Sequence, residues 1–276
     1  MSNKKDSLGE RMKRYENVSR ICLTKKMPVI IRIDGKAFHS FTRGFVRPFD
    51  DVLIKAMQGT AKFLCENIMG CKLAYTQSDE ISLLLVDYER NESQPWFENN
   101  LQKLCSVSAS MATMAFNKTF ELCSLTARMK DSVREDGYEL GNAYKNAMKR
   151  AMFDARAFIL PKEEVCNYFI WRQQDATRNS IQMVAQSLFS HKELQNKNCY
   201  QLQEMMFQEK GNNWNDYATV YKRGSCIVKE TYNIATDNLN PLENEQITRT
   251  RWSVDKEIPI FTQDRDYINK LVFLNG

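Results

Sequence analysis

The sequence predicts an α+β fold whose first part follows the order strand, helix, strand, strand, helix, strand. Short runs rich in β-branched and other apolar residues occupy residues 29–33, 71–76, 81–88 and 153–160. Longer segments with apolar residues at spacings of three and four separate the first run from the second and the third from the fourth. This is the split β-α-β, or ferredoxin-like, plan, in which the first and third strands are central neighbours.

Composition indicates an ordinary globular protein. The chain of 276 residues is 43% apolar and 26% charged, and its net charge of +5 is compatible with a nucleic-acid or polyphosphate partner without demonstrating one. Eight cysteines without a C-x-x-C pair, and only two histidines, argue against a disulfide framework or a structural zinc site. Because no apolar run reaches the length of a signal peptide or a membrane span, we expect a soluble, cytoplasmic protein.

The N-terminal elements follow from local patterns. Residues 6–18 are polar with an apolar stripe at helical spacing, so we expect a short helix that packs on the body through that stripe. The first strand ends in a turn at Asp34, and residues 36–48 resemble a loop. Either Asp50 or Asp51 can cap the following helix, which is long enough for a crossover between strands.

The later elements are read in the same way. We expect a helix from Trp96 to about Cys123, whose many small residues imply close packing on the sheet, and then a polar stretch. The remaining expected elements are helices over residues 163–190 and 202–209 and strands around 219–229 and 251–261. Without a convincing linker, residues 162–276 form a helical and strand-containing C-terminal region that packs on a first region, residues 1–161.

Two acidic positions carry the first functional hypothesis. Asp34 closes the first strand, and Ser78-Asp79-Glu80 fills the turn between the second and third strands. In the predicted strand order Asp34 and Asp79 can approach one another. A carboxylate pair of this kind suits a divalent-metal site that acts on phosphates. The alternative is that both residues are simply turn aspartates.

Basic and aromatic residues near these acids are candidates for nucleotide binding. A triphosphate needs cations, although any single basic residue is more often solvated surface. Phe38, Phe41 and Phe45 can stack on a base or pack in the core, and His39 can orient a phosphate or be an ordinary loop residue. The chain contains no P-loop, dinucleotide-binding or nucleophile-elbow motif. The candidate cations are Lys36, Arg43, Arg47 and Lys103.

Several motifs, taken in order, resemble the tRNA-His guanylyltransferase family. The first are Arg32-Ile33-Asp34-Gly35 with the following Phe38-His39, and Ala74-Tyr75-Thr76-Gln77-Ser78-Asp79-Glu80. The later ones are Phe153-Asp154-Ala155-Arg156, Trp171-Arg172-Gln173-Gln174-Asp175 and Tyr221-Lys222-Arg223-Gly224. The first motif alone would be weak, but the set in this order is specific and spans roughly residues 10–225.

The resemblance implies a palm of the polymerase type and a 3′–5′ nucleotide addition at the 5′ end of tRNA. In that chemistry ATP activates the 5′-phosphate, and the 3′-hydroxyl of an incoming nucleoside triphosphate such as GTP then attacks it. Asp34, the Gly35 carbonyl and Asp79 would hold two Mg²⁺ ions with support from Glu80, and a homotetramer is expected. The nucleotide contacts that the resemblance implies are Asp34, Gly35, Lys36, Ala37, Phe38, His39, Ser78 and Asp79, with Phe45, Arg47, Asp50 and Lys103 in a second tier.

One departure from the family pattern bears on the choice of RNA. Where the His-specific enzymes carry His-Ile-Asn, this chain has Thr177-Arg178-Asn179. The chain is therefore more similar to the guanylyltransferase-like branch, which repairs 5′-truncated tRNAs by templated addition. Addition of a single G to tRNA-His and a non-catalytic tRNA-binding role remain alternatives. Candidates for the tRNA surface are Lys145, Lys149, Arg150, Arg178, Arg249 and Arg251.

Overall fold

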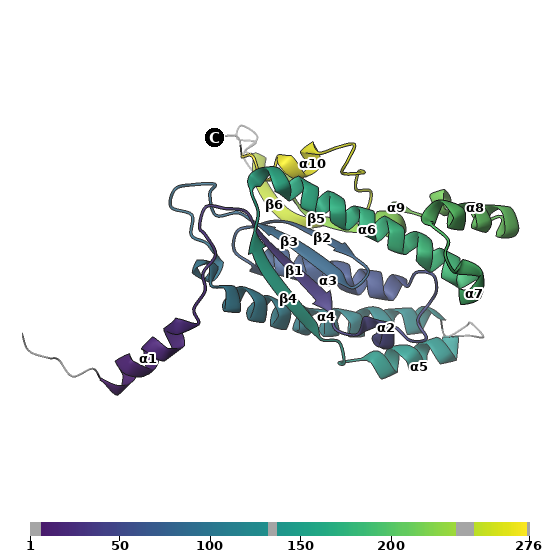
Figure 1. The fold of residues 1–276 in the computed structure, drawn as a ribbon, viewed down its shortest axis with the longest axis horizontal. Helices are drawn as coiled ribbons and strands as arrows, with labels where there is room; N and C mark the ends of the chain where they lie inside the picture. Colours follow the sequence, from purple (N-terminus) through teal and green to yellow (C-terminus); the bar gives the residue numbers. More distant parts are fainter. Residues whose placement is uncertain (1–6, 132–136, 236–245, 275–276) are drawn as a thin grey trace, which may run out of the picture.

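A computed structural model describes residues 7–131, 137–235 and 246–274. Within these ranges one sheet of six strands has the order β4-β1-β3-β2-β5-β6, and every neighbouring pair is antiparallel (Figure 1). The first four strands confirm the predicted α+β, ferredoxin-like plan, and the C-terminal strands extend the same sheet. The strands are β1 (Val29–Gly35), β2 (Cys71–Gln77), β3 (Glu80–Leu85), β4 (Phe153–Ile159), β5 (Ser225–Ala235) and β6 (Gln246–Asp255).

Helices cover both faces of the sheet. The helices α3 and α4 lie on one face, and α6 crosses the other (Figure 1). The α-helices are α1 (Leu8–Val18), α2 (Phe38–Phe41), α3 (Asp51–Asn67), α4 (Leu101–Asp131), α5 (Gly137–Ala147), α6 (Lys162–Leu188), α7 (His191–Leu194), α8 (Cys199–Lys210), α9 (Thr219–Arg223) and α10 (Asp266–Asn269). Short 3₁₀ turns span Trp96–Asn99 and Trp214–Asp216.

The apolar run of β1 is buried on both faces. Ile31 and Ile33 pack in the core with α3 and α4, whereas Ile30 packs in the core with α6. Alternating side chains of a strand point to opposite faces, so a strand covered on both sides needs apolar residues at nearly every position. Each fully buried side chain of this size contributes about 1.5–3 kcal/mol to stability. The end of β1, where Asp34 lies, is therefore held by a rigid scaffold.

The prediction that the N-terminal helix packs on the body was wrong. The helix α1 begins at a capping box between Ser7 and Glu10, as its local sequence favours. However, it extends away from the sheet (Figure 1), and Leu8 and Tyr15 remain 66% and 70% exposed. The capping box explains where the helix begins, but no residue of the helix, its apolar stripe included, is buried.

Three C-terminal and central elements differ from the predicted ones in type or position. Residues 219–223 form helix α9 rather than a strand, although the predicted turn at Arg223-Gly224 is present. Gly224 has a φ of +80° and lies so close to β2 that a Cβ would be 2.4 Å from the Thr76 carbonyl oxygen, so only glycine fits there. The expected polar stretch contains α5, which buries Tyr144 in the core, and the last strand lies earlier than expected.

Candidate active site

The structure brings Asp34 and Asp79 together at one end of the sheet. Asp34 is the penultimate residue of β1, and its partner across the sheet is Glu80, the first residue of β3. The Gly35 amide donates to the Asp79 carbonyl oxygen at 3.1 Å, which fixes the hairpin turn against the end of β1. The strand order predicted this juxtaposition, and the hydrogen bond shows how it is held.

Two backbone features shape this corner. A Cβ on Gly35 would lie 2.4 Å from the Phe38 ring, so a side chain there would displace the aromatic core beneath the site. Ser78 adopts a left-handed backbone with φ of 49°, an unusual conformation for a residue other than glycine. Its hydroxyl donates to Asp79 Oδ1 at 3.1 Å. The turn thus directs a carboxylate toward the end of β1 at some cost in backbone strain.

Electrostatics indicate that this corner suits a cation. Burial, followed by repulsion from Asp34, raises the pKa of Asp79 above its ordinary value. Burial and then repulsion from Asp154 likewise raise the pKa of Asp34, although Arg32 and other arginines oppose that shift. Carboxylates that repel one another in a partly buried site are stabilised by a cation between them.

The donor set fits Mg²⁺. Asp34 and Asp79 supply two carboxylates, and Gly35, whose carbonyl is the third predicted ligand, follows Asp34 and is hydrogen-bonded through its amide to Asp79. Among the described residues, no group of three or more His, Cys, Asp or Glu side chains could hold a metal ion. One or two carboxylates completed by substrate phosphates and water is the arrangement that Mg²⁺ prefers, whereas a structural zinc site needs a closed set of ligands.

A cavity of about 570 Å³ opens beside Asp79, although Asp34 does not line it. Its size is typical of a small-molecule site. The cavity includes Asp79, and its remaining wall comes from the loop around α2, the start of α3 and the C-terminal half of α6. The predicted nucleotide-binding residues that line it are Gly35, Ala37, Phe38, His39, Phe45, Arg47, Asp50, Ser78 and Asp79. The structure therefore brings most of that predicted set together; below we call this cavity the nucleotide pocket.

The aromatic residues of the pocket belong to the core. Phe38 and Phe45 are only 5% and 7% exposed. The Phe38 ring stacks on Phe41 with centroids 4.7 Å apart, and Phe45 stacks on Phe120 at 5.6 Å. Because neighbouring rings already occupy these faces, the phenylalanines form a wall rather than a platform for base stacking.

Asp50 also has a structural task. Its carboxylate accepts hydrogen bonds from the Leu53 amide at 2.9 Å, the Val46 amide at 3.0 Å and the Tyr144 hydroxyl at 2.8 Å. It is the N-cap of α3, as one of the two sequence alternatives predicted. With three protein donors on its carboxylate, Asp50 holds the pocket wall in place.

Three of the four predicted cations, Lys36, Arg43 and Lys103, lie outside the nucleotide pocket. Lys36 lines a separate cavity of about 370 Å³ together with Arg43 and Arg150. Lys103 is near the start of α4, with its amine 5.5 Å from the centroid of the Phe97 ring, and it does not line the pocket. Of these four residues, Arg47 is the one that lines the nucleotide pocket.

The proposed tRNA residues are dispersed. Lys145, Lys149 and Arg150 are at the end of α5 and just beyond it. Arg178 on α6 is ion-paired with Asp175, and Arg249 and Arg251 are on β6. The structure does not gather them into one patch, so their role stays a prediction.

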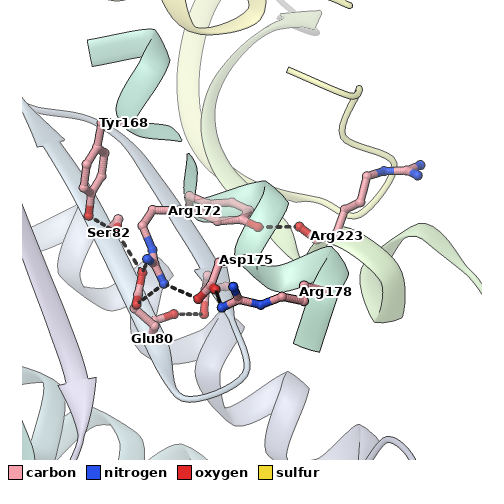
Figure 2. A network of polar contacts seen from close by, with 9 residues as sticks. Glu80, Ser82, Tyr168, Arg172, Asp175, Arg178 and Arg223 are labelled. Atoms are coloured by element: carbon pink, nitrogen blue, oxygen red, sulfur yellow. Dashed lines mark hydrogen bonds and ion pairs between the residues drawn. The ribbon is translucent and has the colours of Figure 1, made fainter. Parts of the chain in front are cut away.

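Glu80, which was predicted to support the metal ions, is paired with an arginine of α6 (Figure 2). Both of its carboxylate oxygens accept hydrogen bonds from Arg172 of α6, at 2.8 and 2.9 Å. The same guanidinium donates to Asp175 at 2.9 Å, and Glu80 and Arg172 are buried. A charged pair this well satisfied holds α6 against the hairpin. Glu80 therefore supports the site by positioning the turn, and both of its oxygens are committed to Arg172.

The sequence did not predict that Arg32, Asp34, Asp154 and Arg156 lie side by side on β1 and β4. We call these four residues the charged strip. On the α6 face of the sheet, Arg32 lies directly opposite Arg156, and Asp34 opposite Asp154. Trp171 is 51% exposed, and the centroid of its ring lies 5.9 Å from the guanidinium carbon of Arg32. The period-two alternation of strand residues was the available signal, since it places Arg32 and Asp34 on one face.

Three residues of α6 that line the nucleotide pocket were also missed: Met183, Gln186 and Ser187. They lie about two to three turns beyond the recognised Trp171–Asp175 motif. The helix itself was predicted, but nothing local indicates that its far end returns to the carboxylates. That information lies in the packing of α6 across the sheet.

Comparisons with known proteins agree with this geometry. The family model described as tRNAHis guanylyltransferase matches residues 9–161. The chain is 48% identical to a solved bacterial tRNA(His) guanylyltransferase-like protein in complex with ATP, covering 98% of this chain and 100% of that one, with a TM-score of 0.81. A structure of such a bacterial protein in complex with GTP matches at 46% identity, 98% and 100% coverage and a TM-score of 0.75.

A curated relative gives the same result. The tRNA(His) guanylyltransferase of Debaryomyces hansenii is 27% identical over 237 residues, which are 81% of this chain and 82% of the relative. The family match covers more than half of the chain and contains Asp34, Asp79 and Glu80. The chain therefore belongs to the tRNA(His) guanylyltransferase family and is a nucleotidyltransferase.

Proposed function

We propose that this enzyme adds nucleotides in the 3′–5′ direction to the 5′ end of tRNA, directed by the opposing template strand. The observation that carries the proposal is the pairing of Asp34 and Asp79 beside a pocket of about 570 Å³. The similar bacterial structures were solved with ATP and with GTP, which supports these nucleotides as substrates here. The cytoplasmic location and homotetrameric state expected from the sequence stay predictions.

The reaction has two steps. An oxygen of the RNA 5′-phosphate attacks the α-phosphorus of ATP, which breaks the α–β phosphoanhydride bond and releases pyrophosphate. The 3′-hydroxyl of the incoming nucleoside triphosphate then attacks the 5′-phosphorus of this adenylylated RNA, loses its proton and displaces AMP. Phosphoryl transfer of this kind needs positioning and charge neutralisation more than a protein nucleophile.

The protein residues supply that positioning. The carboxylates of Asp34 and Asp79 and the Gly35 carbonyl would hold Mg²⁺, which when bound neutralises charge on the reacting phosphates. Arg47 extends the positive charge along the pocket wall, and His39 supplies a further polar group there. The paired Glu80 and Arg172 keep the hairpin turn at the level of Asp34.

The charged strip offers a place for the second phosphate-bearing substrate. Arg32 and Arg156 are directly opposite each other on neighbouring strands, an arrangement that is unfavourable for like charges. A phosphate group between or above them would offset that repulsion. The reaction brings two phosphate-bearing molecules to one metal site. Asp34 belongs to this strip, whereas Asp79 lines the nucleotide pocket. This arrangement supports a two-substrate reaction.

Two alternatives remain. The names of the family and of its curated relatives favour addition of a single G to tRNA-His. Against this, Thr177-Arg178-Asn179 lacks the first two residues of the His-specific motif, and Arg178 is already ion-paired with Asp175. A non-catalytic tRNA-binding role is disfavoured because two nearby carboxylates are costly unless a cation accompanies them.

The test is incubation with a 5′-truncated tRNA, ATP, GTP and Mg²⁺, followed by measurement of product length. We expect extension to the full length, with the added nucleotide changing when the opposing template base is changed. Full-length tRNA-His lacking its extra G is the control substrate. Extension of that control alone, by one G, would establish the single-addition alternative, and no incorporation with either substrate would leave the binding role.

A further inference from the structure

A second cavity of about 460 Å³ lies beyond Arg47, at the far end of α6. It shares two residues, Arg47 and Gln186, with the nucleotide pocket, so the two cavities adjoin. Its other walls are the end of α6, helix α7, the segment that follows α7 and the start of α8. The remaining lining residues are Gln182, Phe189, His191, Leu194, Gln195, Lys197 and Leu202.

The charge of this cavity favours an anion. Arg47, Lys197 and the imidazole of His191 line it, and no lining residue is acidic. The nearest acid on α7, Glu193, has its carboxylate occupied by the Ser190 amide at 2.8 Å and the Ser190 hydroxyl at 2.5 Å. Lys210, whose amine is 5.3 Å from the centroid of the Phe189 ring, lies outside the lining, and after the Ser190 hydrogen bonds it helps to lower the pKa of Glu193. The cluster therefore has cations without carboxylates to balance them among its described lining residues.

Amide side chains give the cavity a second chemical character. Gln182 and Gln186 are one turn apart on an exposed face of α6, and Gln195 approaches from the segment after α7. In the described part of the chain, none of these three amides has a side-chain hydrogen-bond partner. An amide both donates and accepts, as the edge of a nucleobase does. Free amides beside free cations match a base that carries a phosphate.

We propose that this second cavity binds a nucleotide of the RNA strand that leads to the reacting 5′ end, with its phosphate at Lys197 and His191 and its base at the glutamines. The inference rests on the proposed function and assigns a place to its RNA substrate. A nucleoside triphosphate fits less well, because the cavity has no carboxylate to hold the Mg²⁺ that accompanies a triphosphate. Arg47 joins the two cavities and links the strand to the nucleotide pocket.

The test uses the full chain with Gln195→Ala and Lys197→Ala combined. Both side chains are exposed, so we expect the double variant to fold. Lys192→Ala is the matched control, since Lys192 is an exposed cation on α7 that does not line the cavity. The dissociation constant of a labelled 5′-truncated tRNA is measured without nucleotide at several salt concentrations, and the KM for GTP is measured separately.

We expect the double variant to bind RNA at least about fivefold more weakly, with a salt dependence reduced by about one phosphate contact. The control and the KM for GTP should stay within about twofold of the wild type. RNA affinity equal to the wild type, or a raised KM for GTP with RNA affinity unchanged, would overturn the proposal. Because RNA binding is measured without turnover, a wild type that binds RNA but incorporates nothing would refute the proposed function alone.

Discussion

Asp79 and Glu80 are neighbours in the sequence, yet their side chains have opposite environments. The carboxylate of Asp79 has a single described side-chain partner, Ser78, and its pKa is raised by burial and by repulsion from Asp34. Glu80 is buried against Arg172, which donates to both of its oxygens (Figure 2). Asp79 therefore has no described cationic partner, whereas Glu80 is paired with the guanidinium of Arg172.

The comparison separates a functional charge from a structural charge. A buried ion pair that is fully hydrogen-bonded positions the elements that carry it, and removing one partner leaves an unpaired charge. A carboxylate without a cation costs stability, and such an arrangement is expected where a ligand supplies the missing charge. Asp79 should therefore matter mainly for activity, whereas Arg172 should matter mainly for stability.

Asp79→Ala is expected to have the largest effect on activity. Loss of one of two carboxylates should lower nucleotide incorporation by about 10³-fold or more, because the charge that holds the metal is halved. The free energy of unfolding should not fall, since the repulsion with Asp34 is removed. Incorporation of labelled GTP and urea denaturation measure the two quantities. Activity near that of the wild type would show that Asp79 holds no metal.

Arg172→Ala should produce the largest loss of stability. It leaves Glu80 buried without a partner, which should cost about 3–5 kcal/mol of unfolding free energy. The matched control is Arg178→Ala, on the same helix. Its exposed side chain pairs with Asp175 and with no other residue in the described ranges, so the substitution should change stability by about 1 kcal/mol or less. Equal effects of the two substitutions in urea denaturation would contradict a structural role for the buried pair.

The pH dependence of stability should report on the carboxylate pair. In metal-free protein the raised pKa of Asp34 and of Asp79 means that the folded state binds protons more tightly than the unfolded chain, so stability falls as pH rises through the raised values. Asp34→Asn should therefore be more stable than the wild type at pH 7, and the difference should disappear near about pH 3, where both forms are neutral. Thermal denaturation across this range in chelator measures it. A lower stability of the variant at pH 7 would contradict the repulsion.

Removal of residues 1–18 should have the smallest effect. Helix α1 has no buried residue, so deletion should change the free energy of unfolding of the monomer by about 0.5 kcal/mol or less. Urea denaturation at low protein concentration measures the change. A large loss of stability would show that the exposed stripe packs on another surface.

The proximity of Asp34 and Asp79 was predictable because both residues lie at the ends of strands whose order follows from the pattern of apolar runs. The partner of Glu80 was not, since Arg172 lies 92 residues later on a helix whose periodicity does not reveal which strand end it crosses. The positions of Met183 and Gln186 in the nucleotide pocket could not be predicted for the same reason. Helix α9 was mistaken for a strand because β-branched Thr219 and Val220 favour extended structure, while contacts such as the hydrogen bond from Tyr221 to Asp51 at 2.7 Å hold the helix in place.

For α1, the local sequence predicted the helix but not its packing. Periodicity predicted the helix correctly, and its capping box set where it begins. The same stripe suggested burial, but periodicity specifies only that one face is apolar, not what covers it. Element types could thus be predicted where local patterns are strong, whereas contacts between distant elements required the packed structure.

The most direct test of the contrast between the two acids is thermal stability measured against Mg²⁺ concentration at neutral pH. The wild type should gain stability in a saturable way, as expected for a ligand that binds only the folded state. Asp79→Asn should lose that gain while its metal-free stability is equal to or above that of the wild type. Glu80→Gln should be less stable than the wild type without Mg²⁺, but its stability should still rise when Mg²⁺ is added. A saturable gain retained by Asp79→Asn, or lost only in Glu80→Gln, would contradict the assignment of the metal site to Asp34 and Asp79.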